Sequence, residues 1–166
     1  RYGYEMNLLD PDFVMVTGDV VDTETIASGW NYLHFVMNNM EIPLYLLPGN
    51  HDYAGADSRL FQKYGGLLNY SLVIGDFLFI AMDSHTGGYI YEEQLEWAES
   101  VLNKYPEKVK IIGFHHSILS REYQEDLGTV KGGRINGSWK NMEDFENYMY
   151  FTWMDHMDNA QMLFRI

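Results

Sequence analysis

The sequence predicts an α/β fold with a mostly parallel sheet and one β-hairpin. Short apolar runs alternate with segments of helical periodicity, which is typical of parallel strands joined by helices. Two further apolar runs are separated only by Gly75-Asp76, and a two-residue turn of this kind indicates a hairpin. Hydrophobic residues make up 46% of the 166 residues, so the chain can bury a core and fits a single domain, residues 1–166.

The individual elements follow from periodicity and from the residues that interrupt it. We expect buried strands at residues 13–17, 44–47 and 109–114, and hairpin strands at 70–74 and 77–82. We expect helices from Thr23 or Thr25 to about residue 40, and at residues 58–64, 92–104 and 141–156. Residues 1–9 have the pattern of a helix end, residues 117–140 that of a long loop, and residues 160–164 that of a final strand.

Charge and cysteine content limit the function classes. The chain has 24 acidic and 11 basic residues, a net charge of −13, and no basic run, which disfavours nucleic acid as a partner. The absence of cysteine excludes disulfides and thiolate zinc sites, so a metal would need oxygen and nitrogen ligands, which suit Mn, Fe or Zn.

No apolar stretch approaches the roughly 20 residues of a membrane span. A cytoplasmic location is slightly favoured, although a missing N-terminus could hold a signal peptide.

Polar residues follow three of the predicted strands at the point where each strand ends. They are Gly18-Asp19, then Gly49-Asn50-His51-Asp52, then His115-His116. In open α/β sheets, ligands bind at the carboxyl ends of the strands. A carboxylate, a carboxamide oxygen and an imidazole suit a divalent metal, and a histidine can also donate a proton. The sequence therefore predicts a metal site at this edge, formed by three strands that are parallel neighbours.

Several of these residues also have a structural interpretation. Asp19 could cap the following helix, and Asp22 could cap it or orient a neighbouring side chain. Asn50 could form an Asx-turn and still offer its oxygen, and His51 could be an ordinary loop residue.

The motifs GDVVD, LPGNHD and GFHH, in this order and each after an apolar strand, resemble those of the calcineurin-like metallophosphoesterase superfamily. The stretch DSHTGGYIYEEQLEW at residues 83–97 is similar to the corresponding segment of its cyclic-nucleotide phosphodiesterase-like branch. The resemblance covers residues 12–117 and implies a metallophosphoesterase-type α/β sandwich with two divalent metal ions. It implies hydrolysis of a small phosphoester, either a phosphomonoester or a phosphodiester.

The resemblance assigns the metal ligands. It implies that Asp19, Asn50 and His115 bind one ion, that Asp19 bridges to a second ion, and that a hydroxide between the ions attacks phosphorus in line. Successive side chains on a strand alternate, so His115 and His116 cannot both face the metal. The family pattern favours His115 as the ligand and leaves His116 for a supporting or substrate contact.

The same resemblance assigns the residues around the metals. It implies that His51 contacts the phosphoryl oxygen and assists the leaving group, while Asp52 or another carboxylate orients the His51 ring. We expect Gly49 to let the backbone come close to the metals, and Asp22 to cap the helix or orient a neighbouring side chain.

Two motifs of the family, an early Asp-x-His and a late Gly-His-x-His, are absent from these residues. We therefore expect a partial domain, incomplete at both ends, that is inactive or nearly so on its own because ligands of the second metal are missing.

Two alternatives stay open: a non-catalytic metal-binding or protein-interaction module that kept the fold, and a nuclease, which would need a basic surface. The oligomeric state is also open. The full-length reading frame would discriminate between the enzyme and the non-catalytic module.

Overall fold

The computed structural model describes residues 2–22, 27–55, 57–117, 122–126, 129–132, 159 and 162–163. The first half contains α1 (Tyr2–Leu9), β1 (Val14–Thr17), α2 (Ala27–Asn38), β2 (Leu44–Leu47), the 3-10 helix η1 (Asn50–Asp52) and α3 (Arg59–Tyr64). The second half contains β3 (Tyr70–Ile74), β4 (Phe77–Ala81), α4 (Glu92–Lys104), β5 (Val109–Gly113), β6 (Glu122–Asp126) and β7 (Thr129–Gly132). None of the helices in these ranges has the length and apolar character needed to cross a bilayer.

The predicted α/β class is confirmed, but the strands form separate sheets. β1 and β2 pair in parallel, with Val14 opposite Leu44. β3 and β4 form the predicted antiparallel hairpin around Gly75-Asp76, and β4 pairs in parallel with β5. The expectation that the three site strands are neighbours in one sheet was therefore wrong, because β5 is bonded to β4 and not to β1 or β2.

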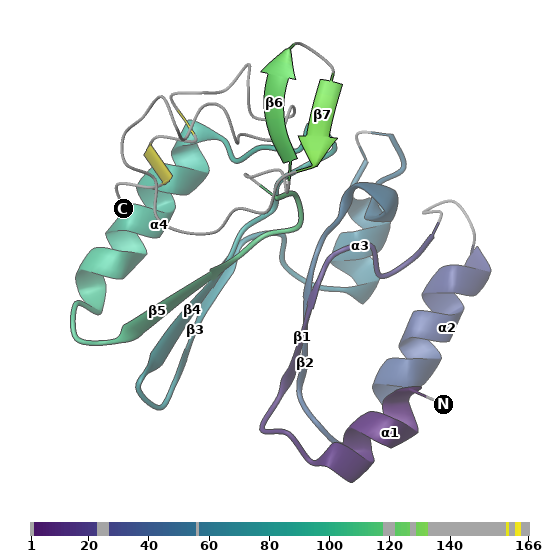
Figure 1. Cartoon of the computed structure of the whole chain (residues 1–166). Helices are drawn as coiled ribbons and strands as arrows, with labels where there is room; N and C mark the ends of the chain where they lie inside the picture. Colours follow the sequence, from purple (N-terminus) through teal and green to yellow (C-terminus); the bar gives the residue numbers. More distant parts are fainter. Residues whose placement is uncertain are drawn as a thin grey trace.

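The β1–β2 sheet and the β3–β4–β5 sheet lie between two layers of helix (Figure 1). Helix α4 covers the β3–β4–β5 sheet, where Leu78 and Ile80 pack with Leu95 and Ala98 of the helix. Helices α2 and α3 cover the β1–β2 sheet through a second apolar cluster, which includes Trp30, Leu33, Leu46 and Phe61. Burial of these residues stabilises each layer at roughly 1.5–3 kcal/mol per large side chain.

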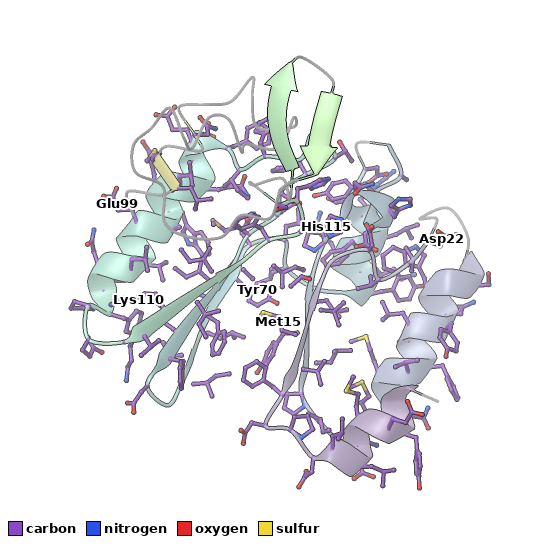
Figure 2. The ribbon with its side chains drawn as sticks, in the orientation of Figure 1. Met15, Asp22, Tyr70, Glu99, Lys110 and His115 are labelled. Atoms are coloured by element: carbon purple, nitrogen blue, oxygen red, sulfur yellow. The ribbon has the colours of Figure 1, made fainter. Side chains whose placement is uncertain are left out.

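Contacts between the sheets hold them face to face. The Phe13 and Phe79 rings meet edge to face with centroids 5.1 Å apart. The Tyr70 hydroxyl donates a hydrogen bond of 3.1 Å to the Leu46 carbonyl, so β3 is tied to β2. Figure 2 shows Tyr70 and Met15 between the two sheets, below His115. As a result, the carboxyl ends of β1, β2 and β5 come together although they belong to different sheets (Figure 1).

Three predicted elements differ from the structure or lie outside its described residues. The predicted loop at 117–140 contains the antiparallel pair β6–β7, with Glu122 opposite Gly132. In the predicted strand at 160–164, Met162 and Leu163 are helical, and Leu163 packs into the α4 cluster. A short apolar run cannot be told from a buried helical turn by periodicity, which explains this error. The predicted helix at 141–156 and the start of the helix at Thr23 or Thr25 lie outside the described residues.

The inter-sheet bond of Tyr70 predicts alkaline sensitivity. Burial raises the pKa of Tyr70 to about 12, above the value of roughly 10 expected in the unfolded chain. The neutral phenol therefore contributes stability that is fully present below about pH 10 and is lost as the pH rises towards about 12. Urea unfolding between about pH 9 and about pH 12 should show a fall in the free energy of unfolding of the wild type and a smaller fall for Tyr70→Phe.

The exposed Tyr32 provides the control for this prediction. Tyr32→Phe should retain the wild-type pH dependence of the free energy of unfolding, because the Tyr32 side chain is exposed. An identical pH dependence in Tyr70→Phe and wild type would show that Tyr70 ionises without a cost to the fold.

Candidate metal centre

Two glycines allow the loops after β1 and β2 and the segment after β5 to meet without a gap. A Cβ on Gly18 would lie 2.5 Å from His115 Nδ1 and 2.8 Å from Gly49 Cα. A Cβ on Gly49 would overlap the backbone nitrogen and the carboxylate of Asp19. Gly18 also has a φ of 101°, in the region that favours glycine. The three predicted site segments are therefore in direct contact.

Asp19 lies at the centre of this convergence. Its backbone has a φ of 54°, a left-handed conformation that Asp tolerates better than most residues. The backbone N–H of His51 donates a hydrogen bond of 3.0 Å to Asp19 Oδ1. Asp19 Oδ2 lies 3.4 Å from His115 Nε2. One carboxylate oxygen is thus held by the η1 loop while the other faces the histidine from β5.

The His115 ring is oriented by a backbone carbonyl. Its Nδ1 lies 2.8 Å from the carbonyl oxygen of Thr17, 98 residues away in the sequence. Because a carbonyl only accepts, Nδ1 carries a proton, so in a neutral ring the lone pair is on Nε2. Metal-binding histidines show this arrangement, in which the second ring nitrogen donates to a carbonyl or carboxylate. His115 therefore presents a free Nε2 lone pair next to the Asp19 carboxylate.

The spacing of these donors fits a divalent ion. Two atoms that each lie about 2.0–2.2 Å from one ion are about 3.0–3.5 Å apart, which matches the 3.4 Å between Asp19 Oδ2 and His115 Nε2. Asn50 is the first residue of η1, in the loop after β2. Within the part of the chain that the structure describes, no three His, Cys, Asp or Glu side chains gather, so an ion here would need the Asn50 amide as well.

His51 is exposed and is oriented by a backbone group. Its Nδ1–H donates a hydrogen bond of 2.8 Å to the carbonyl oxygen of Asp22, which leaves Nε2 for solvent or substrate. This bond, and secondly the charge of Asp19, raise the pKa of His51. The expectation that Asp52 or another carboxylate lies behind the ring was wrong for this contact, since Asp22 acts through its main chain.

Asp52 instead joins the loops. Its side chain is fully buried, and it accepts hydrogen bonds from the backbone N–H of Val21 at 3.0 Å and of Gly49 at 2.7 Å. Burial raises the pKa of Asp52, although the two backbone donors oppose this effect. The carboxylate therefore connects the loop after β1 to the loop after β2. Sequence patterns could not show this, because both donors are backbone groups.

His116 has a different partner from His115, and both residues follow the end of β5 at Gly113. His116 Nδ1 lies 2.8 Å from Ser84 Oγ, and its backbone N–H donates to the same oxygen at 3.2 Å. Burial, followed by the charge of His115, lowers the pKa of His116. Ser84 was missed by the sequence analysis, although it follows β4, which is parallel to β5 and ends at the same edge.

Comparisons with known proteins identify the family of the chain. The family model described as calcineurin-like phosphoesterase matches residues 5–165. The chain belongs to the calcineurin-like phosphoesterase family. This membership confirms the resemblance and the α/β class that it implied. The roles of Asp19, Asn50, His115 and His51 stay predictions.

Relatives of this calcineurin-like phosphoesterase chain carry phosphodiesterase names. A probable glycerophosphodiester phosphodiesterase GpdQ from Arcobacter nitrofigilis is 36% identical over 115 residues, which cover 64% of this chain and 42% of that protein. A 3',5'-cyclic-nucleotide phosphodiesterase from Nostoc is 33% identical over 113 residues, or 66% and 42%. The 3',5'-cyclic adenosine monophosphate phosphodiesterase CpdA from Escherichia coli K12 is 30% identical, with 65% and 41%. The matches confirm the phosphodiesterase-like branch and span less than half of each relative.

Proposed function

We propose that the protein containing this chain hydrolyses a small phosphoester in a metal-dependent reaction. The observation that carries the proposal is the pairing of Asp19 with His115, whose Nε2 lone pair is freed by the bond from Nδ1 to Thr17. A carboxylate and an imidazole oriented in this way at this distance are suited to hold a divalent ion. Membership of the calcineurin-like phosphoesterase family supports phosphoester hydrolysis as the chemistry.

Asp19, Asn50 and His115 would hold one divalent ion, and Asp19 would be shared with a second. Mn, Fe and Zn suit this mixture of carboxylate, amide and imidazole ligands. Bound ions of this kind lower the pKa of water and stabilise charge on phosphoryl oxygens. The chain's own contribution is to fix the donors, since His51 N–H holds one oxygen of Asp19 and the Thr17 carbonyl holds the ring of His115.

His51 would act on the substrate. Its Nδ1–H is occupied by the Asp22 carbonyl, so the ring offers Nε2 to a phosphoryl or leaving-group oxygen. The ring is exposed, while its backbone N–H is bonded to Asp19. A single residue therefore connects the proposed ligand and the proposed substrate contact. Asp52 would support this loop from below and would not itself touch the substrate.

The substrate class is a small phosphodiester. The names of the relatives, glycerophosphodiester and cyclic-nucleotide phosphodiesterases, support a diester over a monoester. The net charge of −13 also disfavours long polyanions. Hydrolysis of bis(p-nitrophenyl) phosphate by the full-length protein with Mn²⁺, and loss of hydrolysis after chelation, would test the proposal. A folded full-length protein that binds Mn²⁺ and cleaves no diester would favour the non-catalytic module.

His51→Ala should separate metal binding from turnover. We expect Mn²⁺ binding to stay close to that of the wild type, because the His51 backbone N–H that holds Asp19 remains. We expect kcat to fall about 10²–10⁴-fold, the usual loss when a proton donor is removed. Elemental analysis beside steady-state kinetics measures both quantities.

His34→Ala is the matched control, because His34 is an exposed histidine on α2 whose ring lies beside Asn38 and packs edge to face against Tyr64. It should leave both quantities unchanged. If His51→Ala empties the metal site as fully as Asn50→Ala does, the role given to His51 is wrong.

A further inference from the structure

Two fully buried polar residues, Asp83 and Ser84, lie between the loops that form the candidate metal centre. They follow β4 after one intervening residue, Met82, and both side chains are inaccessible to solvent. A buried carboxylate and a buried hydroxyl are costly unless their hydrogen bonds are satisfied. The bonds that satisfy them lead in two directions.

The Asp83 carboxylate is bonded to the loop after β2. The Tyr53 hydroxyl donates to Asp83 Oδ2, and Tyr53 is the residue that directly follows η1 and Asp52. Tyr53 is itself buried, and burial together with this bond raises its pKa, so the phenol stays protonated and donates. The other oxygen of Asp83 accepts from the backbone N–H of His85 at 2.7 Å.

The Ser84 hydroxyl is bonded to the segment after β5. It accepts from the His116 backbone N–H at 3.2 Å and lies 2.8 Å from His116 Nδ1. The rings of His116 and His115 are in edge-to-face contact with centroids 4.9 Å apart. Loss of the Ser84 hydroxyl would therefore affect His116 first, and then His115, which is adjacent to His116 in the chain and in contact with its ring.

The backbone of Asp83 is anchored independently of both loops. Its N–H donates to Asn69 Oδ1 at 2.9 Å, and its carbonyl accepts from Gln94 Nε2 at 2.8 Å. Gln94 also donates to Asn69 Oδ1 at 2.6 Å, which closes the network. Because Gln94 belongs to α4, the segment 83–84 is fixed to the rigid layer behind the β3–β4–β5 sheet.

We propose that Asp83 and Ser84 are positioning residues, which connect the η1 loop through Tyr53 to the His115-His116 segment and so set the separation of Asp19 and His115. The consequence for the metal rests on the proposed function, whereas the effect on His115 does not. Both connections belong to one path, so breaking either of them should release the same constraint.

The test uses single-group deletions, because replacing Asp83 would leave several buried donors without an acceptor and lower stability. Tyr53→Phe and Ser84→Ala each remove one hydroxyl and keep the rest of the side chain. Tyr70→Phe is the matched control, since it also removes a tyrosine hydroxyl bonded between the sheets, to the Leu46 carbonyl. The double variant of Tyr53→Phe with Ser84→Ala completes the set.

Two measurements are made on this chain. The first is the set of ¹⁵N ring resonances of His51 and His115 without metal, which report the local geometry and the protonated ring nitrogen. The second is the affinity for Mn²⁺ by titration calorimetry. We expect Tyr53→Phe and Ser84→Ala to shift the His115 ring signals and to weaken Mn²⁺ binding about tenfold, while Tyr70→Phe changes neither. The double variant should bind Mn²⁺ about as weakly as each single variant, because one path is broken only once.

Ring signals of His115 that match those of Tyr70→Phe in both single variants would overturn the proposal. A loss in the double variant equal to the product of the two single losses would also overturn it, since the two residues would then act separately. If the wild-type chain binds no Mn²⁺, the proposed metal site fails, and the ring resonances still decide whether Asp83 and Ser84 position His115.

Discussion

Asp19→Asn is expected to lower the affinity for Mn²⁺ strongly and to reduce kcat/KM of the full-length protein by about a thousandfold or more. The amide keeps the shape of the side chain, tolerates the φ of 54°, and can still accept from the His51 backbone N–H. What it removes is the negative charge 3.4 Å from His115 Nε2. Loss of a metal that contributes several kcal/mol to transition-state stabilisation corresponds to a factor of this size.

Asp76→Asn is the control for this variant. Asp76 is an exposed aspartate in the β3–β4 turn. This turn lies at the end of the sheet opposite the carboxyl end of β5 (Figure 1). Isothermal calorimetry with Mn²⁺ and diester hydrolysis should be unchanged in Asp76→Asn. Wild-type Mn²⁺ affinity in Asp19→Asn would show that Asp19 caps or shapes the loop without binding metal.

Gly49→Ala is expected to disrupt the site and to destabilise the chain by about 3 kcal/mol or more. A Cβ at this position would overlap the backbone nitrogen and the carboxylate of Asp19, so the two loops must separate. Overpacking in a tight interior costs about 1–3 kcal/mol, and here the obstacle is largely backbone, which cannot rotate away. The separation would also move Asp19 relative to His115. Urea unfolding and Mn²⁺ titration should both show the defect.

Gly113→Ala is the matched control, since Gly113 lies in β5, two positions before His115. An added Cβ there would lie 3.5 Å from Leu47 Cδ2, which is an ordinary contact. We expect it to change stability by less than about 1 kcal/mol and to leave Mn²⁺ affinity unchanged. If Gly49→Ala behaves like Gly113→Ala, the loops are not packed as tightly as the structure shows.

The position of the candidate site follows from local patterns. The apolar runs that end at Thr17, Leu47 and Gly113 are strands in the structure, and the polar residues after them lie together. Strand alternation was expected to separate His115 from His116, but β5 ends at Gly113 before both, and what the structure shows is different partners, Thr17 for His115 and Ser84 for His116. These inferences succeed because the period of a strand and the polarity of its carboxyl end depend on neighbouring residues.

Other features of the site depend on partners that are distant in the sequence. The His51 ring bonds to the Asp22 carbonyl and the His115 ring to the Thr17 carbonyl. Every residue has a carbonyl, so no side-chain pattern indicates which one will be used. For the same reason the bond from the distant Val21 N–H to Asp52 could not be foreseen, whereas the bond from Gly49 N–H to Asp52 is local.

The residue pattern of this chain specifies strands β1 to β5, the α/β class and the loops that carry Asp19, Asn50, His51 and His115, because these depend on short-range periodicity and residue type. The three-dimensional packing specifies the rest: β5 joins β4 in a separate sheet, and Asp83 and Ser84 come to lie between the two loops. Sheet partners are chosen by which faces bury the most apolar surface across the whole chain, and that competition involves contacts that no local window contains.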